Sequence, residues 1–187
     1  MTVEYNKLVG YDLYANLLQS SALEKVGRWC ATTNFGVICG SAAVAIHLGK
    51  DIRAVSPDLD ILISNHPEAI ASALSTFGKE HLSRNRFGFS NMVDDMETDW
   101  LIAKGQWQMA AIENAVTWNG LAVMSLPFLI ISKLISNRDK DRNDLQLIFN
   151  KNEKAFGVAH SLLKTLNMEK EAQDLKSDLH LFRLLKS

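Results

Sequence analysis

Two aspartates separated by one residue, Asp58 and Asp60, stand at the start of an apolar run, and they constrain the fold more than any other feature of the sequence. The run continues through Ile61 to Ile63, a composition typical of a buried strand. Side chains two residues apart in a strand point to the same face, so the two carboxylates project together while Leu59 turns toward the core. The chain must therefore build a β-sheet whose edge or face carries paired acidic groups.

A second strand is predicted just upstream, followed by a Gly-Ser pair. Residues 35–39 are short, apolar and bounded by turn residues, as expected of a buried strand. Gly40 and Ser41 end that strand. Residues 42–48 have the composition of a tightly packed helix, and Gly49 supplies its C-terminal stop signal. The predicted order is strand, Gly-Ser turn, helix, and then the strand that opens with Asp58.

The other patterned segments favour a mixed sheet with flanking helices. Helical spacing is found in residues 8–32, 67–77, 128–136, 141–149, 154–166 and 169–185, and strand patterns in 84–93 and 96–103. Strands and helices in this order predict an α/β (α+β) fold. We expect residues 1–125 to form the α/β core with its N-terminal helices, and residues 126–187 to form a C-terminal helical subdomain packed on that core.

Composition narrows the class of protein. A chain of 187 residues with 47% apolar content can bury one full core. Its net charge of −1 argues against bulk binding of nucleic acid, so contact with RNA or DNA would be local. Two cysteines are too few to staple a secreted domain, and the longest apolar run, about 121–135, is shorter than the roughly 20 residues of a membrane span. We therefore expect a cytoplasmic protein that does not enter a membrane.

The paired aspartates predict a metal site beside a phosphate site. Two carboxylates held this close repel each other unless a cation neutralises them, and hard oxygen ligands suit Mg²⁺ or Mn²⁺ with substrate phosphates completing the shell. Gly40 would let the backbone approach a triphosphate closely. Ser41 and the first amides of the following helix would donate hydrogen bonds to phosphate oxygens. A nucleoside triphosphate (NTP) is therefore the expected substrate.

A third carboxylate is expected on a neighbouring strand, where it would act as a general base or share a metal ion. Asp95, Glu97 and Asp99 all fall on one face of a strand by the period-two rule. We favour Asp99 because the apolar run after it, residues 100–102, continues into a buried strand. Asp95 and Glu97 lie nearer the turn and remain alternatives.

These residues resemble the nucleotidyltransferase superfamily, in which Gly-Gly or Gly-Ser at a strand end precedes Asp-x-Asp or Asp-x-Glu and a later carboxylate. Two further features resemble its bacterial toxin-like branch of the AbiEii type. One is the small-residue helix at 43–47 with Arg53 ahead of Asp58. The other is the series Lys133, Arg138, Lys140, Asp141 and Asp144, which is similar to the helical signature of that branch.

The resemblance implies roles for individual residues. Asp58, Asp60 and Asp99 would be the catalytic metal ligands, and Gly40, Ser41, Arg53 and Lys133 would bind the NTP. An alternative for Lys133 is a structural one, in which it forms salt bridges with Asp141 and Asp144.

The resemblance also implies the transfer of a nucleoside monophosphate to a tRNA end or a protein hydroxyl, often by a toxin that is paired with an antitoxin protein. Many members have larger C-terminal parts than this chain, so the acceptor stays open. Two alternatives remain beside this function. One is an inactive nucleotide-binding or protein-binding module of the same fold, and the other is a small-molecule, antibiotic-type nucleotidyltransferase.

Overall fold

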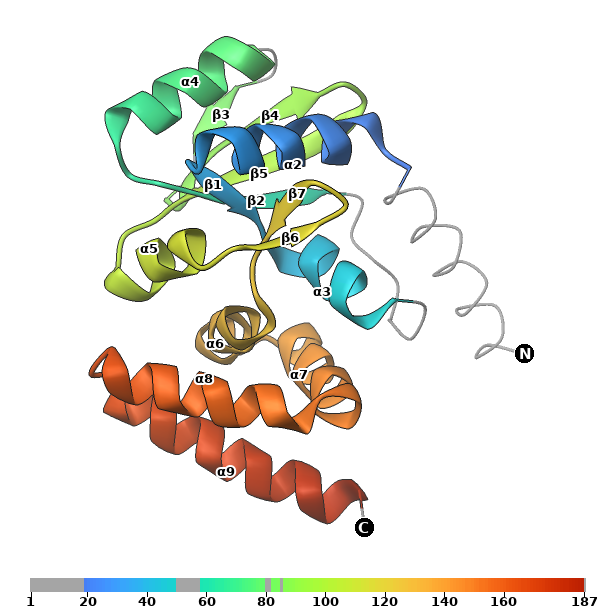
Figure 1. Cartoon of the computed structure of the whole chain (residues 1–187), viewed down its shortest axis with the longest axis vertical. Coiled ribbons are helices and arrows are strands. Elements are labelled where there is room, and N and C mark those ends of the chain that lie inside the picture. Colours follow the sequence, from blue (N-terminus) through green and yellow to red (C-terminus); the bar gives the residue numbers. More distant parts are fainter. Residues whose placement is uncertain (1–18, 50–57, 80–81, 85, 187) are drawn as a thin grey trace.

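The described strands form one mixed sheet in the order β3-β4-β5-β2-β1-β7-β6. A computed structural model describes residues 19–49, 58–79, 82–84 and 86–186 (Figure 1). The strands are β1 (Gly36–Ile38), β2 (Leu59–Ile63), β3 (Ser83–Arg84), β4 (Gly88–Val93), β5 (Met96–Ile102), β6 (Val116–Trp118) and β7 (Leu121–Val123). The helices are α2 (Ser21–Thr33), α3 (Gly40–Leu48), α4 (Pro67–Phe77), α5 (Gln106–Glu113), α6 (Leu126–Ser136), α7 (Asp139–Lys151), α8 (Glu153–Thr165) and α9 (Glu169–Lys186).

Strand β2 occupies the centre of the sheet and fixes the place of the paired aspartates. It runs antiparallel to β1 and parallel to β5. In the pairing with β5, Asp60 lies directly opposite Asp99. Side chains that face each other across neighbouring strands share one face of the sheet, so this register brings two predicted site residues together.

The opposite face of the sheet is closed by an aromatic cluster. Trp29 of α2 and Phe77 of α4 pack against Trp100 of β5, with ring centroids 5.6 and 5.4 Å from the Trp100 ring. Trp100 is fully buried, and its indole nitrogen donates a 2.7 Å hydrogen bond to the Asn91 side chain. Because Trp100 follows Asp99 in the strand, burying the indole directs the carboxylate to the other face.

Helices α6 to α9 lie together beyond the side of the sheet that α3 and α5 flank (Figure 1). Helix α3 packs against both α6 and α7, and the Lys151 ammonium donates to the Leu48 carbonyl at the end of α3. The four helices predicted after residue 126 are thus present. The division into a core and a subdomain stays a prediction, since the strands and helices do not by themselves test it.

The structure differs from the sequence-based expectation in three places. The strand predicted over residues 84–93 is divided into β3, which ends at Arg84, and β4, which begins at Gly88. Helix α3 begins at Gly40 rather than Ala42, because Cys39 is extended and Gly40 takes a φ of +59° that turns the chain directly into the helix. Helix α5 and the β6–β7 hairpin were not predicted. The hairpin carries an Asn119-Gly120 turn with positive φ at both residues, and this residue pair is a strong sequence signal for a hairpin.

Two predicted features lie outside the described residues: the first part of the N-terminal helical segment, residues 8–18, and Arg53. Within the described chain, no helix combines the length and the apolar character needed to cross a bilayer.

Candidate active site

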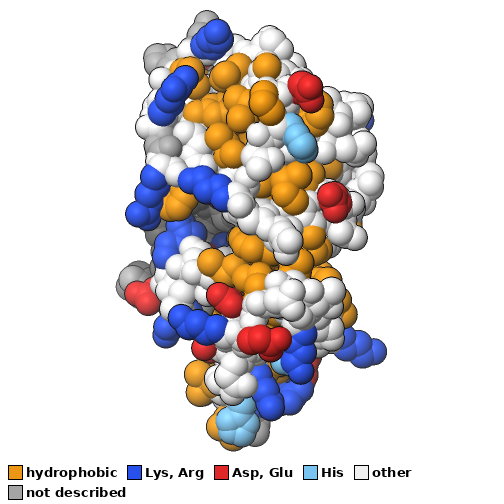
Figure 2. Space-filling model, turned by 90° about the vertical axis from the view of Figure 1, so that its left-hand side faces the viewer, with side chains coloured by type: hydrophobic (Ala, Val, Ile, Leu, Met, Phe, Trp, Pro, Cys, Tyr) orange, Lys and Arg blue, Asp and Glu red, His pale blue; other side chains and the backbone are white. Residues whose placement is uncertain are grey.

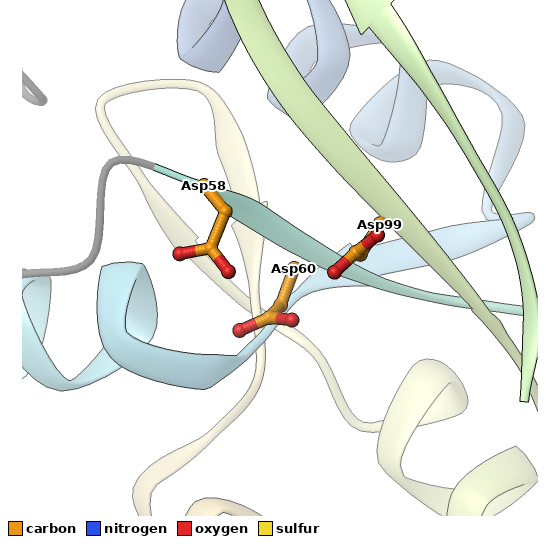
Figure 3. Close-up of side chains that lie close together, drawn as sticks. All are labelled: Asp58, Asp60 and Asp99. Carbon is orange, nitrogen blue, oxygen red and sulfur yellow. The ribbon is translucent and has the colours of Figure 1, made fainter. Parts of the chain in front are cut away.

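Three carboxylates converge on the face of the sheet opposite the aromatic cluster. Asp58 stands immediately before β2, Asp60 lies within it, and Asp99 lies on β5 (Figure 3). Each offers an oxygen atom, and these three atoms all lie within 4.8 Å of one another. The cluster includes Asp99 and neither of its alternatives, Asp95 or Glu97. The catalytic roles assigned to the three aspartates remain predictions.

The cluster is electrostatically strained in the absence of a cation. Burial raises the pKa of Asp60 to about 6, with further contributions from the negative charges of Asp58 and Asp99. Burial also raises the pKa of Asp99, together with the nearby charges of Glu97 and Asp58. Like charges in a partly buried site disfavour ionisation of one another, so these groups gain most from a positive partner.

The donor set fits a divalent cation. Asp58 Oδ1 is buried and has no hydrogen-bond partner among the described residues. A buried oxygen that is unsatisfied costs free energy unless another group binds it. Three carboxylate oxygens within reach of one point suit Mg²⁺ or Mn²⁺, which take hard oxygen ligands and leave positions for substrate phosphates. Asp58, Asp60 and Asp99 would hold such an ion.

Gly40 makes room for one of these carboxylates. A Cβ atom at position 40 would lie 1.9 Å from Asp60 Oδ2 and 2.6 Å from the carboxylate carbon. The close approach and the positive φ both exclude a side chain at this position. Gly40 therefore lies directly against the Asp60 side chain, which accounts for a glycine at this position.

The start of α3 offers amide groups beside the carboxylates. Its N-cap residue, Cys39, makes no side-chain capping bond within the described structure. The first amides of a helix lack partners inside the helix and carry the positive end of its dipole, a combination that favours anions. Ser41 lies in this first turn and is 8% exposed. A role for Gly40 and Ser41 in binding a triphosphate stays a prediction.

Lys133 is buried in a network of ion pairs. Its ammonium lies 3.0 Å from Asp141 Oδ1 and 2.8 Å from Asp144 Oδ2, and Arg138 Nε approaches Asp141 Oδ2 at 2.6 Å. The salt bridges considered as an alternative for Lys133 are thus present. A contact of Lys133 with the NTP stays a prediction. The positive charge of Lys133 nevertheless acts on the carboxylate cluster, because it lowers the pKa of Asp60.

Ser90 belongs to the site, and the sequence alone did not predict it. It lies opposite Asp99 in the pairing of β4 with β5, is 8% exposed, and its hydrogen bond to the Asp99 side chain lowers the pKa of that carboxyl. The strand pattern of residues 84–93 was visible, but the register of that strand against β5 was not. Only the register identifies Ser90 as the neighbour of Asp99.

Comparisons with known proteins are informative at the level of the fold. No protein-family model matches the chain, and no curated protein sequence matches it. The antibiotic-resistance factor ANT(2'')-Ia superposes with a TM-score of 0.53 at 14% identity, covering 84% of this chain and 98% of that one. A candidate nucleotidyltransferase from H. pylori gives a TM-score of 0.52 at 14% identity, covering 92% and 94%. The chain has the nucleotidyltransferase fold.

These likenesses show the fold alone, because one fold hosts many functions. The carboxylate cluster carries the chemical argument. These likenesses do not confirm the AbiEii-type branch, so that narrower resemblance rests on the sequence motifs.

Proposed function

We propose that this nucleotidyltransferase-fold protein is a metal-dependent enzyme that transfers a nucleoside monophosphate from an NTP to a hydroxyl group of RNA, such as a tRNA, or of a protein. The observation that carries the proposal is the convergence of Asp58, Asp60 and Asp99 beside the start of α3. Carboxylates that would bind the cation thus lie beside amides that would donate hydrogen bonds to phosphate, as a reaction at a triphosphate requires.

The reaction forms one bond at the α-phosphorus and breaks another. The acceptor oxygen attacks the α-phosphorus, the bond from that phosphorus to the bridging oxygen of the β-phosphate breaks, and pyrophosphate leaves. Asp99, which lies opposite Asp60 on the neighbouring strand, would accept the proton of the acceptor hydroxyl as the general base. A bound Mg²⁺ or Mn²⁺ would neutralise the charge that develops on the phosphate oxygens.

Within this proposal the enzyme is a toxin of the AbiEii type, with an antitoxin protein as its partner and the cytoplasm as its compartment. Support comes from an ion-pair network in which Lys133, Asp141 and Asp144 are buried and Arg138 is exposed; all four are residues of the helical signature. Two cationic residues of the signature, Lys133 and Lys140, act electrostatically on the carboxylate cluster, because both lower the pKa of Asp60.

A second candidate is a nucleotidyltransferase that modifies an antibiotic. The likeness of the fold to ANT(2'')-Ia favours it. Transfer to a small molecule but to neither RNA nor protein would support this alternative.

The third candidate, an inactive binding module, predicts NTP binding without turnover.

The proposed function is tested by incubating the protein with Mg²⁺ or Mn²⁺, each α-³²P-labelled NTP, and RNA or protein acceptors. We expect label on an acceptor with wild type and not with Asp58→Asn/Asp60→Asn. Asp174→Asn, an exposed carboxylate on α9, is the matched control. Metal-dependent NTP binding without any transfer would refute the enzyme proposal.

A further inference from the structure

A pocket of about 630 Å³ lies among the C-terminal helices. Residues from the end of α7, the start of α8 and the second half of α9 line it. Helix α9 packs along α8, as Figure 1 shows, so these three segments meet around one space. The volume falls within the range of about 300–1,000 Å³ that is usual for pockets that bind small molecules.

The residues that line this pocket are strongly basic. Of the ten described residues that line it, four are cationic and only Glu153 is acidic. The whole chain, by contrast, has 20 Lys and Arg residues and 21 Asp and Glu residues. Over the lower half of the face in Figure 2, where α6 to α9 lie, acidic and basic side chains are likewise interspersed. We name the four cationic residues the C-terminal basic pocket: Lys151, Lys154, Arg183 and Lys186.

Contacts within the fold keep the cations of α9 beside those of α7 and α8. Arg183 Nε lies 2.8 Å from Glu153 Oε1, and this ion pair joins α9 to α8. The Lys186 ammonium lies 5.4 Å from the centroid of the Phe149 ring, which belongs to α7. The Arg183–Glu153 pair is exposed and uses Nε, and a guanidinium has further N–H donors on its terminal nitrogens. One carboxylate therefore leaves most of the positive charge of the pocket uncompensated.

Gly157 forms part of the wall of the pocket, and the packing of the fold does not require a glycine there. It lies inside α8, where glycine is less favourable than alanine. A Cβ atom at this position would meet no described atom within 4 Å. The missing side chain instead allows a ligand in the pocket to approach the helix backbone closely.

The pocket is separate from the carboxylate cluster. Helix α3 begins at Gly40, which lies against Asp60, and ends at Leu48, whose carbonyl accepts a hydrogen bond from the Lys151 ammonium. A helix of this length spans about 12 Å. The cluster and the pocket thus lie at opposite ends of α3, and the NTP proposed for the cluster does not account for the pocket.

We propose that the C-terminal basic pocket binds a small molecule that carries more than one phosphate group, as a nucleoside polyphosphate or an inorganic polyphosphate does. Four positive charges against one negative charge leave an excess of three. A single phosphate group carries only about −1.5 to −2 charge at neutral pH, so it would not balance this excess. Lys and Arg are the usual partners of phosphate. Leu179 and the aliphatic parts of the Lys side chains offer apolar surface to a nucleoside.

The inference is independent of the proposed function and is tested by isothermal titration calorimetry of the full chain with ATP or inorganic tripolyphosphate, with a chelator present. Without a divalent cation the acidic cluster should not hold a triphosphate, so the heat of binding reports on the pocket. We expect saturable binding below about 1 mM ligand, a common range for cellular small molecules. Equal affinity for the two ligands would assign recognition to the phosphates, and tighter binding of ATP would add a contribution from the nucleoside. Both results support the inference.

Two variants assign the binding to this pocket. Lys154→Ala/Lys186→Ala should weaken it about 10- to 150-fold, because hydrogen bonds from charged groups are lost. Gly157→Leu should weaken it about 5- to 150-fold by occupying the space at the wall. Leu also favours a helix more than Gly does, so this variant should fold at least as well as wild type. Lys170→Ala is the matched control, because Lys170 is exposed on the side of α9 opposite Leu179 and should leave affinity unchanged.

Three outcomes would overturn the inference. The first is the absence of saturable binding by wild type at about 1 mM of either ligand. The second is equal affinity in wild type, Lys154→Ala/Lys186→Ala and Gly157→Leu. The third is binding of adenosine, which has no phosphate, as tightly as ATP. Nucleotidyl transfer is not a readout of this experiment, so a failure of the proposed function would leave its result unchanged.

Discussion

At Gly40 the lack of a side chain is a requirement of the site rather than of the helix. The position of a Cβ atom is already taken by the Asp60 carboxylate, and the backbone has a φ of +59°. A larger residue must therefore displace either the carboxylate or the start of α3. Since both are parts of the proposed metal and phosphate sites, the effect should be larger on activity than on stability.

Gly40→Ala is expected to reduce nucleotidyl transfer about 100-fold, because a displacement of about 1 Å in an active site has an effect of that size. It should lower the free energy of unfolding by about 1–2 kcal/mol from the left-handed backbone alone. Transfer rates and urea denaturation measure the two effects. Gly157→Ala in α8, where no described atom lies within 4 Å of the added Cβ, is the control and should raise stability by about 0.5–1 kcal/mol. Unchanged transfer in Gly40→Ala would contradict the assigned geometry.

Asp60 should make the metal-free protein less stable as the pH rises. Its pKa is raised to about 6, above the ordinary value of 3.8. A group of this kind contributes stability that is fully present below its unfolded pKa and is lost as the pH rises through its folded pKa. Asp60→Asn removes the charge, so with a chelator present it should be more stable than wild type at about pH 8, by at most about 3 kcal/mol.

The difference in the free energy of unfolding between Asp60→Asn and wild type should shrink toward about pH 4. Urea denaturation with a chelator at the two pH values measures this difference. Nucleotidyl transfer by the variant should be abolished at every pH. A variant that is less stable than wild type at the higher pH would show that the carboxylate is satisfied without a cation.

Two neighbouring residues of strand β4 point to opposite faces of the sheet, one toward the proposed catalytic site and one toward the core. Ser90 faces the carboxylate cluster, opposite Asp99, and Asn91 faces the core, where it accepts the hydrogen bond of the Trp100 indole. Both side chains are buried. The alternation of a strand therefore offers a matched pair of variants one residue apart.

Ser90→Ala should lower the transfer rate about tenfold and shift its acidic pH limit upward, because Asp99 loses a hydrogen bond that lowers its pKa. Asn91→Ala should instead lower the free energy of unfolding by about 1–3 kcal/mol, since it leaves the buried indole donor without a partner. The pH profile of transfer and chemical denaturation distinguish the two. Similar effects of both variants on the two readouts would contradict the assignment of faces.

The start of α7 is held to α6 by buried charge. Burial disfavours the ionised form of Asp141, but hydrogen bonds from Arg138 and Lys133 outweigh it and hold the pKa of Asp141 well below its ordinary value. A lowered pKa contributes stability above the unfolded value that is lost as the pH falls through the folded one. The network should therefore stabilise the helices at neutral pH and weaken in strong acid.

Asp141→Asn should lower the free energy of unfolding at pH 7 by about 3–5 kcal/mol, because it removes one partner of a buried ion pair and leaves Lys133 undercompensated. Asp139→Asn, an exposed carboxylate in the same helical turn, should change it by less than about 0.5 kcal/mol. Urea denaturation measures both. An equal loss in the two variants would mean that the network contributes little.

Local patterns in the sequence predicted most helices and strands. Helix α4 has the predicted bounds, and β1, β2 and the four C-terminal helices lie where apolar spacing placed them. Helix α5 was missed because it is short and its N-cap residue, Gly105, has no side chain that could cap the helix. The hairpin after it was hidden in an apolar run that the structure divides between β7 and α6.

At the scale of the whole molecule, the site depends on contacts that are distant in sequence. The pair Asp58 and Asp60 was predictable because period-two spacing is a local rule. The pairing of Asp60 with Asp99, the position of Ser90, and the order in which β1 lies between β2 and β7 come from long-range strand pairing. A single sequence does not show which residues of two neighbouring strands pair with each other, so these features could be found only in the structure.

The central claim is that Asp58, Asp60 and Asp99 hold a divalent cation beside a triphosphate. The most direct measurement is Mn²⁺ binding by electron paramagnetic resonance, with and without a non-hydrolysable NTP analogue. We predict that wild type binds Mn²⁺ and binds it more tightly with the analogue, and that Asp58→Asn and Asp60→Asn lose both effects. Equal Mn²⁺ binding by wild type and these variants, or no Mn²⁺ binding by wild type with the analogue present, would contradict the claim.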